Sequence, residues 1–134
     1  MRRKKRLSVD WKPAPDIKRR LNHLQNSLNL DWIKKSSIYC FRSKNSSSRA
    51  YARIWGLSKV WQLALGKGPA YIIEVLSEKY DELSVREQDR VLLHEIAHIP
   101  KNFSGSLLPH IRRRGKRNFH DRVEELYTNY IRSR

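Results

Sequence analysis

The sequence lacks several features on which other classes of small protein depend. It has a single cysteine, Cys40, which excludes an internal disulfide and any zinc ribbon built on cysteine pairs. No apolar run approaches the roughly 20 residues that cross a bilayer. No apolar stretch follows the basic N-terminus, as a secretory signal would require. We therefore expect a soluble, cytoplasmic protein with no membrane partner.

Acidic residues are also scarce, and unevenly so along the chain. The 134 residues include 29 Lys and Arg but only 13 Asp and Glu, which gives a formal net charge of +16. Residues 1–73 carry 17 basic and 3 acidic residues, a net charge of +14, whereas residues 74–134 carry 12 and 10. Basic residues cluster at residues 2–6 and again at Arg112, Arg113, Arg114, Lys116 and Arg117.

Such clusters favour the phosphate backbone of nucleic acids, because their binding releases condensed counterions. We therefore predict that the chain contacts nucleic acid through these basic patches. Nothing in the sequence distinguishes DNA from RNA. The alternative interpretation is a solvated tail and a solvated loop that only aid solubility.

Chain length and hydrophobic periodicity predict one small α+β domain. A chain of this length fits a single domain, which we place at residues 13–134, behind a flexible basic arm at residues 1–12. Hydrophobic spacing and turn signals predict helices at residues 16–30, 58–65, 84–99 and 119–132, and strands at residues 37–42, 50–57 and 70–76. We expect the first two strands to form a hairpin. The third strand is either an edge strand that could pair with a peptide substrate or an interior strand.

Four aromatic side chains of the predicted strands and the short helix are expected in the core: Tyr51, Trp55, Trp61 and Tyr71. Core packing is a commoner role for such residues than stacking on nucleobases.

The chemical centre of the sequence is the run His-Glu-Ile-Ala-His at residues 94–98. On a helix, His94 and His98 lie one turn apart on the same face, so both imidazoles can bind one metal ion. Zinc accepts such nitrogen ligands and leaves a position open for water in catalytic sites. Glu95 stands where a carboxylate can take the proton of that water. The five residues therefore predict two ligands and a general base for one Zn²⁺ per chain.

A catalytic zinc site needs a third protein ligand, and the sequence offers several. His110 is the first choice, because the loop of 11 residues that separates it from His98 lets the chain return to the metal. His120, at the start of the last predicted helix, is the alternative. A carboxylate of Glu124 or Glu125 is the third option, although an exposed acidic face explains both residues more simply.

One subclass of zinc peptidase is excluded. Its extended pattern HExxHxxGxxH needs glycine at position 101 and histidine at position 104, where the chain has Lys101 and Ser104. Its methionine turn is also impossible, since Met1 is the only methionine.

Several stretches resemble a known family. YIIEVLSEKYDELS, VLLHEIAHIP, FSGSLLPH and FHDRVEELY are similar to metallopeptidases of archaea and their viruses, which are related to the phage metallopeptidases and more distantly to SprT-like zincins. The resemblance covers roughly residues 50–130 and is weak over residues 1–48. It implies a compact, minimal zincin-like domain in which a small mixed sheet packs on the metal-binding helix.

The resemblance also implies roles for individual residues. It implies zinc at His94 and His98, Glu95 as the base, and a third histidine downstream. The segment SLLPH favours His110 as that ligand, whereas FHDRVEEL keeps His120 open.

Two functions of different class remain. The first is a zinc metallopeptidase that hydrolyses protein or peptide substrates, including proteins bound to nucleic acid, on which SprT-like proteases act. The alternative is a small basic nucleic-acid-binding protein whose zinc site is structural or vestigial. The sequence indicates no oligomeric state.

Overall fold

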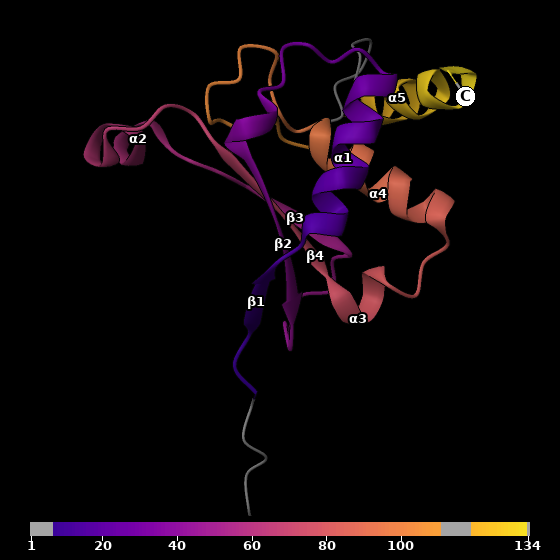
Figure 1. The fold of residues 1–134 in the computed structure, drawn as a ribbon, viewed down its shortest axis with the longest axis horizontal. Coiled ribbons are helices and arrows are strands. Elements are labelled where there is room, and N and C mark those ends of the chain that lie inside the picture. Colours follow the sequence, from indigo (N-terminus) through magenta and orange to yellow (C-terminus); the bar gives the residue numbers. More distant parts are fainter. Residues whose placement is uncertain (1–6, 111–118, 134) are drawn as a thin grey trace, which may run out of the picture.

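A computed structural model describes residues 7–110 and 119–133 (Figure 1). The predicted basic clusters at residues 2–6 and 112–117 lie outside the described residues. The elements follow in the order β1 (Asp10–Pro13), α1 (Pro15–Ser27), a 3₁₀ turn (Lys35–Ser37), β2 (Ile38–Lys44), β3 (Ala52–Gly56), α2 (Lys59–Leu65), β4 (Tyr71–Leu76), α3 (Ser77–Tyr80), α4 (Val85–Ile96) and α5 (Phe119–Ser133).

The four strands form one mixed sheet in the order β1-β2-β4-β3. β4 pairs parallel with β2 and antiparallel with β3, while β1 pairs antiparallel with β2. This confirms the α+β class and the small mixed sheet. The predicted hairpin of residues 37–42 with 50–57 is wrong, because β4 lies between β2 and β3. β4 reads YIIEVL, and a strand that is apolar apart from Glu74 is stable where it has neighbours on both sides.

The sheet begins earlier than the sequence indicates. Residues 10–12 were expected in the arm, but Asp10–Pro13 form β1, an edge strand. All four residues are exposed, so no apolar alternation marks this strand in the sequence. Pro13 is tolerated there because an edge strand does not need every N–H for pairing.

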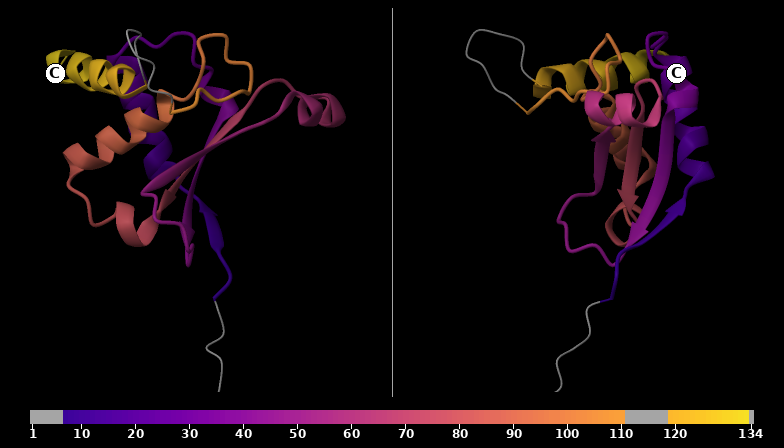
Figure 2. Two further views of the ribbon diagram at one scale, coloured as in Figure 1. Left: turned by 180° about the vertical axis from the view of Figure 1, so that it is seen from behind. Right: turned by 90° about the vertical axis from the view of Figure 1, so that its left-hand side faces the viewer.

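Helices α1 and α4 pack on one face of the sheet, and α5 packs against them (Figures 1 and 2). The core between these layers is formed by buried apolar side chains of α1, β2, β4 and α4, among them Leu21, Leu24, Ile38, Ile73, Val75, Leu92, Leu93 and Ile96. The Arg20 guanidinium joins α1 to α4 by donating to both carboxylate oxygens of Asp89, at 2.7 and 2.5 Å. This ion pair links the two helices that cover the sheet.

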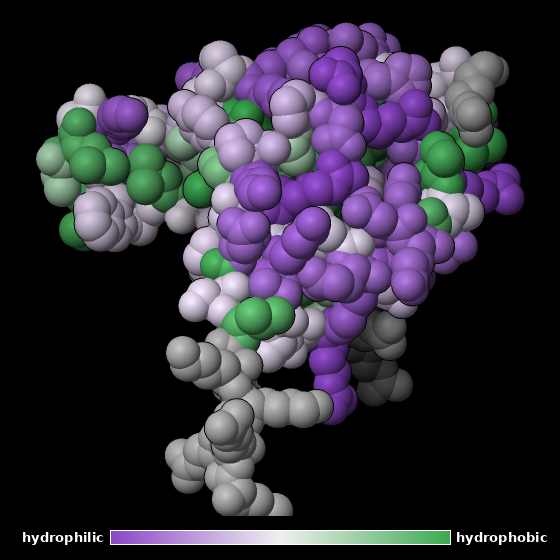
Figure 3. All heavy atoms as spheres, turned by 60° about the horizontal axis from the view of Figure 1, so that its bottom comes forward, coloured by the Kyte–Doolittle hydropathy of each residue, from purple (hydrophilic) through white to green (hydrophobic). Residues whose placement is uncertain are grey.

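Helix α2 projects from the ends of β3 and β4 (Figures 1 and 2). Its exposed side chains include Trp61 and Leu63, and its aliphatic residues form a green patch beside a mostly polar body in Figure 3. The core assignment of aromatic residues therefore holds for Tyr71 but is wrong for Tyr51, Trp55 and Trp61, which are about half exposed. The described residues include no helix that is both long and apolar enough to cross a membrane.

Helix α4 starts at its predicted cap and ends before its predicted end. The Ser84 hydroxyl oxygen accepts a hydrogen bond from the Glu87 amide at 3.2 Å, as an N-cap should. The last α-helical residue is Ile96. Beyond it, the amides of His98 and Ile99 bond to carbonyls three residues back, which tightens the chain into a turn. Pro100 explains this end, because a proline disfavours helical geometry in the residue before it.

Candidate metal centre

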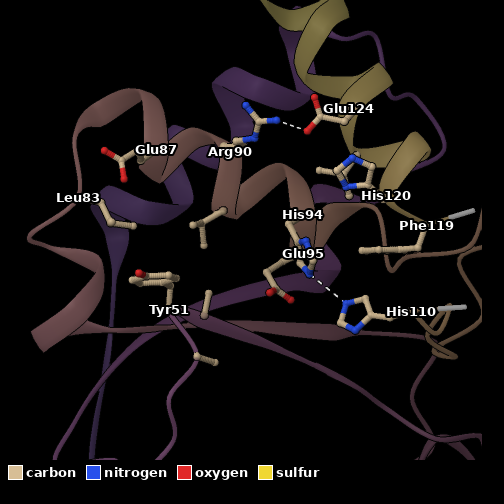
Figure 4. Close-up of a pocket in the computed structure, with 14 residues that line it drawn as sticks. Tyr51, Leu83, Glu87, Arg90, His94, Glu95, His110, Phe119, His120 and Glu124 are labelled. Carbon is tan, nitrogen blue, oxygen red and sulfur yellow. Dashed lines mark hydrogen bonds and ion pairs between the residues drawn. The ribbon is translucent and has the colours of Figure 1, made fainter. Parts of the chain in front are cut away.

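Three histidines meet at the end of helix α4. His94 lies in the last turn of the helix, His98 in the tight turn after it, and His110 at the end of the loop that follows (Figure 4). One ring nitrogen from each imidazole lies within 4.8 Å of the other two. The Nε2 atoms of His94 and His110 are 3.0 Å apart. Within the described part of the chain, this is the one cluster of three such residues close enough to hold a metal ion.

The loop that carries His110 is fixed to β4 through Tyr71. The Tyr71 hydroxyl accepts a hydrogen bond from the Gly105 amide at 2.8 Å and donates one to the Ser106 carbonyl at 2.9 Å. Tyr71 is almost fully buried, and its ring contacts Phe103 edge to face. Strand β4 thus positions this loop through one side chain.

A second set of contacts fixes the same loop to the base of α2. The buried Gln62 amide donates to the Leu57 carbonyl at 2.8 Å and to the Ser104 carbonyl at 2.9 Å. Gly105 adopts φ +95°, and a Cβ atom there would lie 2.3 Å from the Leu57 carbonyl oxygen. A Cβ at Gly56 would lie 2.1 Å from the Gly105 oxygen. Both glycines are needed because the two backbones approach so closely.

His98 is oriented by Leu108. The Nδ1 atom of His98 lies 2.5 Å from the Leu108 carbonyl oxygen, and the Leu108 amide donates to the His98 carbonyl at 2.7 Å. A carbonyl can only accept, so Nδ1 carries the proton and Nε2 keeps its lone pair. A histidine that binds a metal is commonly oriented by such a bond from its second nitrogen.

Phe119, the first residue of α5, covers one side of the cluster. Its ring stacks on His98 with centroids 4.2 Å apart, and it contacts His94 and His110 at 4.9 and 4.7 Å. Phe119 and Tyr71 are the residues at the site whose position the sequence analysis missed. The one signal for Phe119 in the sequence was its place at the start of FHDRVEEL, a segment of the family resemblance.

The environment favours the neutral form of two of the histidines, His94 and His98. Burial, with the neighbouring imidazoles of His98 and His110, lowers the pKa of His94 to about 4. Burial also lowers the pKa of His98. At neutral pH both rings therefore offer unprotonated nitrogens, the form that binds metal ions.

Glu95 lies beside the cluster and faces the same pocket (Figure 4). Its side chain is 6% exposed, and burial raises its pKa to about 8. A cation among the histidines would oppose that shift, because a nearby positive charge favours the carboxylate. A carboxyl group whose protonation can change near neutral pH suits a proton acceptor.

A pocket of about 700 Å³ opens over these groups. Its walls come from the start of β3, from α4 and from the start of α5, and include Tyr51, Leu83, Val91 and Val123. His120 and Glu124 also line it, but neither joins the three-histidine cluster. Glu124 instead forms an ion pair with Arg90. Of the two histidines that the sequence offers as the third ligand, His110 lies beside His94 and His98, and His120 lines the pocket outside the cluster.

The three histidines can therefore hold one metal ion at the mouth of a pocket that Glu95 also lines. A sequence model of the family described as "Putative phage metallopeptidase" matches residues 9–130, so the chain belongs to that family. The match includes the N-terminal part in which the sequence resemblance was weakest. No curated protein and no solved structure matches the chain significantly.

Proposed function

We propose that this protein is a zinc-dependent endopeptidase in which His94, His98 and His110 hold one Zn²⁺ and Glu95 is the general base. The observation that carries the proposal is the cluster of three imidazoles beside a buried carboxyl group on the wall of an open pocket. Membership of a metallopeptidase family supports the same conclusion.

The donor atoms fit zinc. Zinc binds histidine nitrogen at about 2.0–2.1 Å in tetrahedral sites, which places two ligand nitrogens about 3.3 Å apart. The Nε2 atoms of His94 and His110 are 3.0 Å apart, so a small adjustment of the rings would admit the ion. Three imidazoles without a thiolate are a ligand set of catalytic rather than structural zinc sites.

The residues of the chain would then divide the work of peptide hydrolysis. A zinc ion supplies Lewis-acid polarisation of the scissile carbonyl and acidifies the attacking water. The Glu95 carboxylate takes the proton from that water and passes it to the leaving amine. Phe119 would cover one side of the histidines, and the end of α4 buries the Glu95 side chain, which is 6% exposed. The Leu108 carbonyl holds His98 in the tautomer that leaves Nε2 free.

The substrate would lie along β3. The sequence left open whether residues 70–76 form an edge or an interior strand, and β4 is interior. β3 is the edge strand beside α4, and Ala50, Tyr51 and Ala52 at its start line the pocket. We propose that an extended peptide pairs with the outer edge of β3, through backbone hydrogen bonds, with its scissile bond at the histidines.

The experiment that tests the function uses Glu95→Gln. This variant should keep one zinc per chain by elemental analysis, yet cleave an unfolded protein such as casein at least 100-fold more slowly, because the proton acceptor is lost. Full cleavage by Glu95→Gln would rule out this mechanism.

A second pair of variants tests the ligands. His110→Ala should lose stoichiometric zinc, whereas His120→Ala, which changes a histidine of the same pocket outside the cluster, should retain it. Zinc retained in His110→Ala and lost in His120→Ala would assign the third ligand to His120.

We also propose a nucleic-acid partner, on the strength of the net charge of +16. The peptidase would then act on proteins associated with nucleic acid, and a relation to SprT-like zincins stays a prediction. Neutralising Arg112, Arg113, Arg114, Lys116 and Arg117 should weaken nucleic-acid binding and leave cleavage of a short free peptide largely unchanged.

The alternative function, a nucleic-acid-binding protein with a structural or vestigial zinc site, is favoured by the same charge. It predicts that neither the wild-type chain nor Glu95→Gln cleaves any protein, while both bind nucleic acid.

A further inference from the structure

The face of the sheet that turns away from α1 and α4 carries a set of exposed aromatic side chains. Trp11 of β1 is 52% exposed, Tyr39 of β2 is 51% exposed and Trp55 of β3 is 49% exposed. The strand register places Tyr39, Ile72 and Trp55 in one row across β2, β4 and β3. No helix of residues 7–110 or 119–133 packs on this face as α1 and α4 pack on the other.

Two of these indoles border a hollow. Trp11 and Trp55, from the two edge strands, line a cavity of about 210 Å³ together with Phe41, Ile72 and Glu74. Pockets for drug-sized ligands have about 300–1,000 Å³, so this hollow admits one group of the size of an aromatic ring. Its lining is almost wholly apolar apart from the Glu74 carboxylate.

The Glu74 carboxylate holds the Trp55 indole in place. Glu74 is 1% exposed, and its two oxygens accept hydrogen bonds from Trp55 Nε1 at 3.0 Å and from the Arg53 guanidinium at 2.9 Å. The guanidinium carbon also lies 5.3 Å from the centre of the Trp55 ring system. Because Arg53 offsets the charge of Glu74, the hollow is close to neutral. Because the Trp55 indole is already hydrogen-bonded to Glu74, it has little rotational freedom left to lose when a ligand binds.

Positive charge is concentrated in the part of the chain that carries most of this face. Residues 32–73 include eight Lys and Arg and no Asp or Glu. Two exposed lysines, Lys59 on α2 and Lys67 in the loop after it, follow the end of β3 that carries Trp55. Lys12 and Lys44 are also exposed, but strand alternation turns them to the face opposite that of Trp11 and Tyr39. A polymer that fits this surface has flat rings for the indoles and regular negative charges for the lysines.

We propose that the outer face of the sheet binds single-stranded nucleic acid, with one base in the hollow between Trp11 and Trp55 and the flanking phosphates near the lysines. Proteins that bind single strands combine immobilised aromatic rings with a positively charged path in this way. The paired bases of a duplex are stacked on each other and cannot enter the hollow. The surface is therefore selective for single strands and tolerant of base sequence.

The test measures binding of a fluorescein-labelled 12-nucleotide single strand of mixed sequence by anisotropy, with the full chain and a zinc chelator present. The chelator separates this result from any peptidase activity. Trp11→Ala and Trp55→Ala should each weaken binding by about 5- to 100-fold, the usual loss for one stacked base. The slope of affinity against salt should stay unchanged, because no phosphate contact is removed.

The matched control is Trp61→Ala, which removes an indole of similar exposure from α2, outside the hollow. It should bind the single strand within twofold of wild type. Trp55→Phe, which keeps a ring for stacking, should recover most of the loss in Trp55→Ala. Thermal melts of each variant check that the fold persists.

Three results would overturn the proposal. The first is a loss in Trp11→Ala and Trp55→Ala no larger than that in Trp61→Ala. The second is equal affinity of the wild-type chain for the single strand and the matching duplex. The third is self-association that Trp55→Ala abolishes while nucleic-acid binding remains, since the face would then be an interface between copies of this chain.

Discussion

Replacing Tyr71 by Phe removes one oxygen atom from the chain and tests how the third histidine is held. The Tyr71 hydroxyl is the bridge between β4 and the loop that ends at His110, through its bonds with Gly105 and Ser106. The ring itself would stay packed on Phe103, so the change affects hydrogen bonding and very little else.

The loss of stability in Tyr71→Phe depends on the two backbone groups that lose their hydrogen-bond partner. The Gly105 amide is buried, and a buried donor without a partner costs about 1–3 kcal/mol. The Ser106 carbonyl lies in a partly exposed position, so water can replace much of that bond, and its loss costs about 0.5–1.5 kcal/mol. Tyr71→Phe should therefore lower the free energy of unfolding by about 2–4 kcal/mol.

The free energy of unfolding is measured by urea denaturation of the protein after treatment with a chelator. Zinc affinity is measured separately, at pH 7 without urea, by titration of zinc against a competing chelator. We expect the loss of stability and, in addition, zinc binding at least 10-fold weaker, because His110 is less well positioned. Tyr39→Phe is the control, since it removes an exposed tyrosine hydroxyl and should change stability by less than about 0.5 kcal/mol. A Tyr71→Phe protein as stable as wild type, with the same zinc affinity, would refute the reasoning.

Three other variants test the scaffold. Arg20→Ala leaves the buried Asp89 carboxylate without its bidentate partner. Urea denaturation should show a free energy of unfolding lower by about 3 kcal/mol. This is the low end for a broken buried ion pair, because the arginine is partly exposed. Burial raises the pKa of Glu74, but hydrogen bonds from Arg53 and Trp55 outweigh it and lower the pKa below 4.5. The Glu74 carboxylate therefore stabilises the fold above pH 4.5, and this contribution is lost as the pH falls through the lowered pKa. Glu74→Gln should therefore be destabilising at pH 7 and lose that deficit as the pH falls through the lowered pKa of Glu74, as measured by denaturation over a series of acidic pH values. Gly105→Ala brings a Cβ against a backbone carbonyl and should weaken zinc binding, whereas Gly68→Ala, with nothing within 4 Å, should bind zinc like wild type. Equal zinc titrations for these two glycine variants would contradict the close approach.

The helices and the outline of the site could be predicted because their signals are local. Ser84 as a cap and Pro100 as a stop bound α4 to within a few residues, and the spacing of His94 and His98 needs only one helical turn. The third histidine needed more than spacing. Spacing allowed either His110 or His120, whereas the long-range contacts of Tyr71, Gln62 and His98 with the intervening loop place His110 at the cluster.

Strand order and the exposure of aromatic residues could not be predicted, because both depend on contacts between distant segments. The order places β4 between β2 and β3, although β3 precedes β4 in the chain, and no short-range pattern encodes that insertion. Trp55 alternates with inward-facing residues as a core tryptophan would. It lies on the open face because the helices cover only the opposite side of the sheet.

The interior position of β4 has a consequence for how this chain can vary. Successive side chains of a strand point to opposite faces, so Tyr71 turns toward the loop of the metal cluster while its neighbour Ile72 turns toward the hollow on the other side. One backbone therefore supplies both surfaces, in alternation. Insertion or deletion of a single residue within β4 would exchange the two sets of side chains and disrupt both surfaces at once. Related chains should consequently vary in the length of their loops but keep the length of this strand.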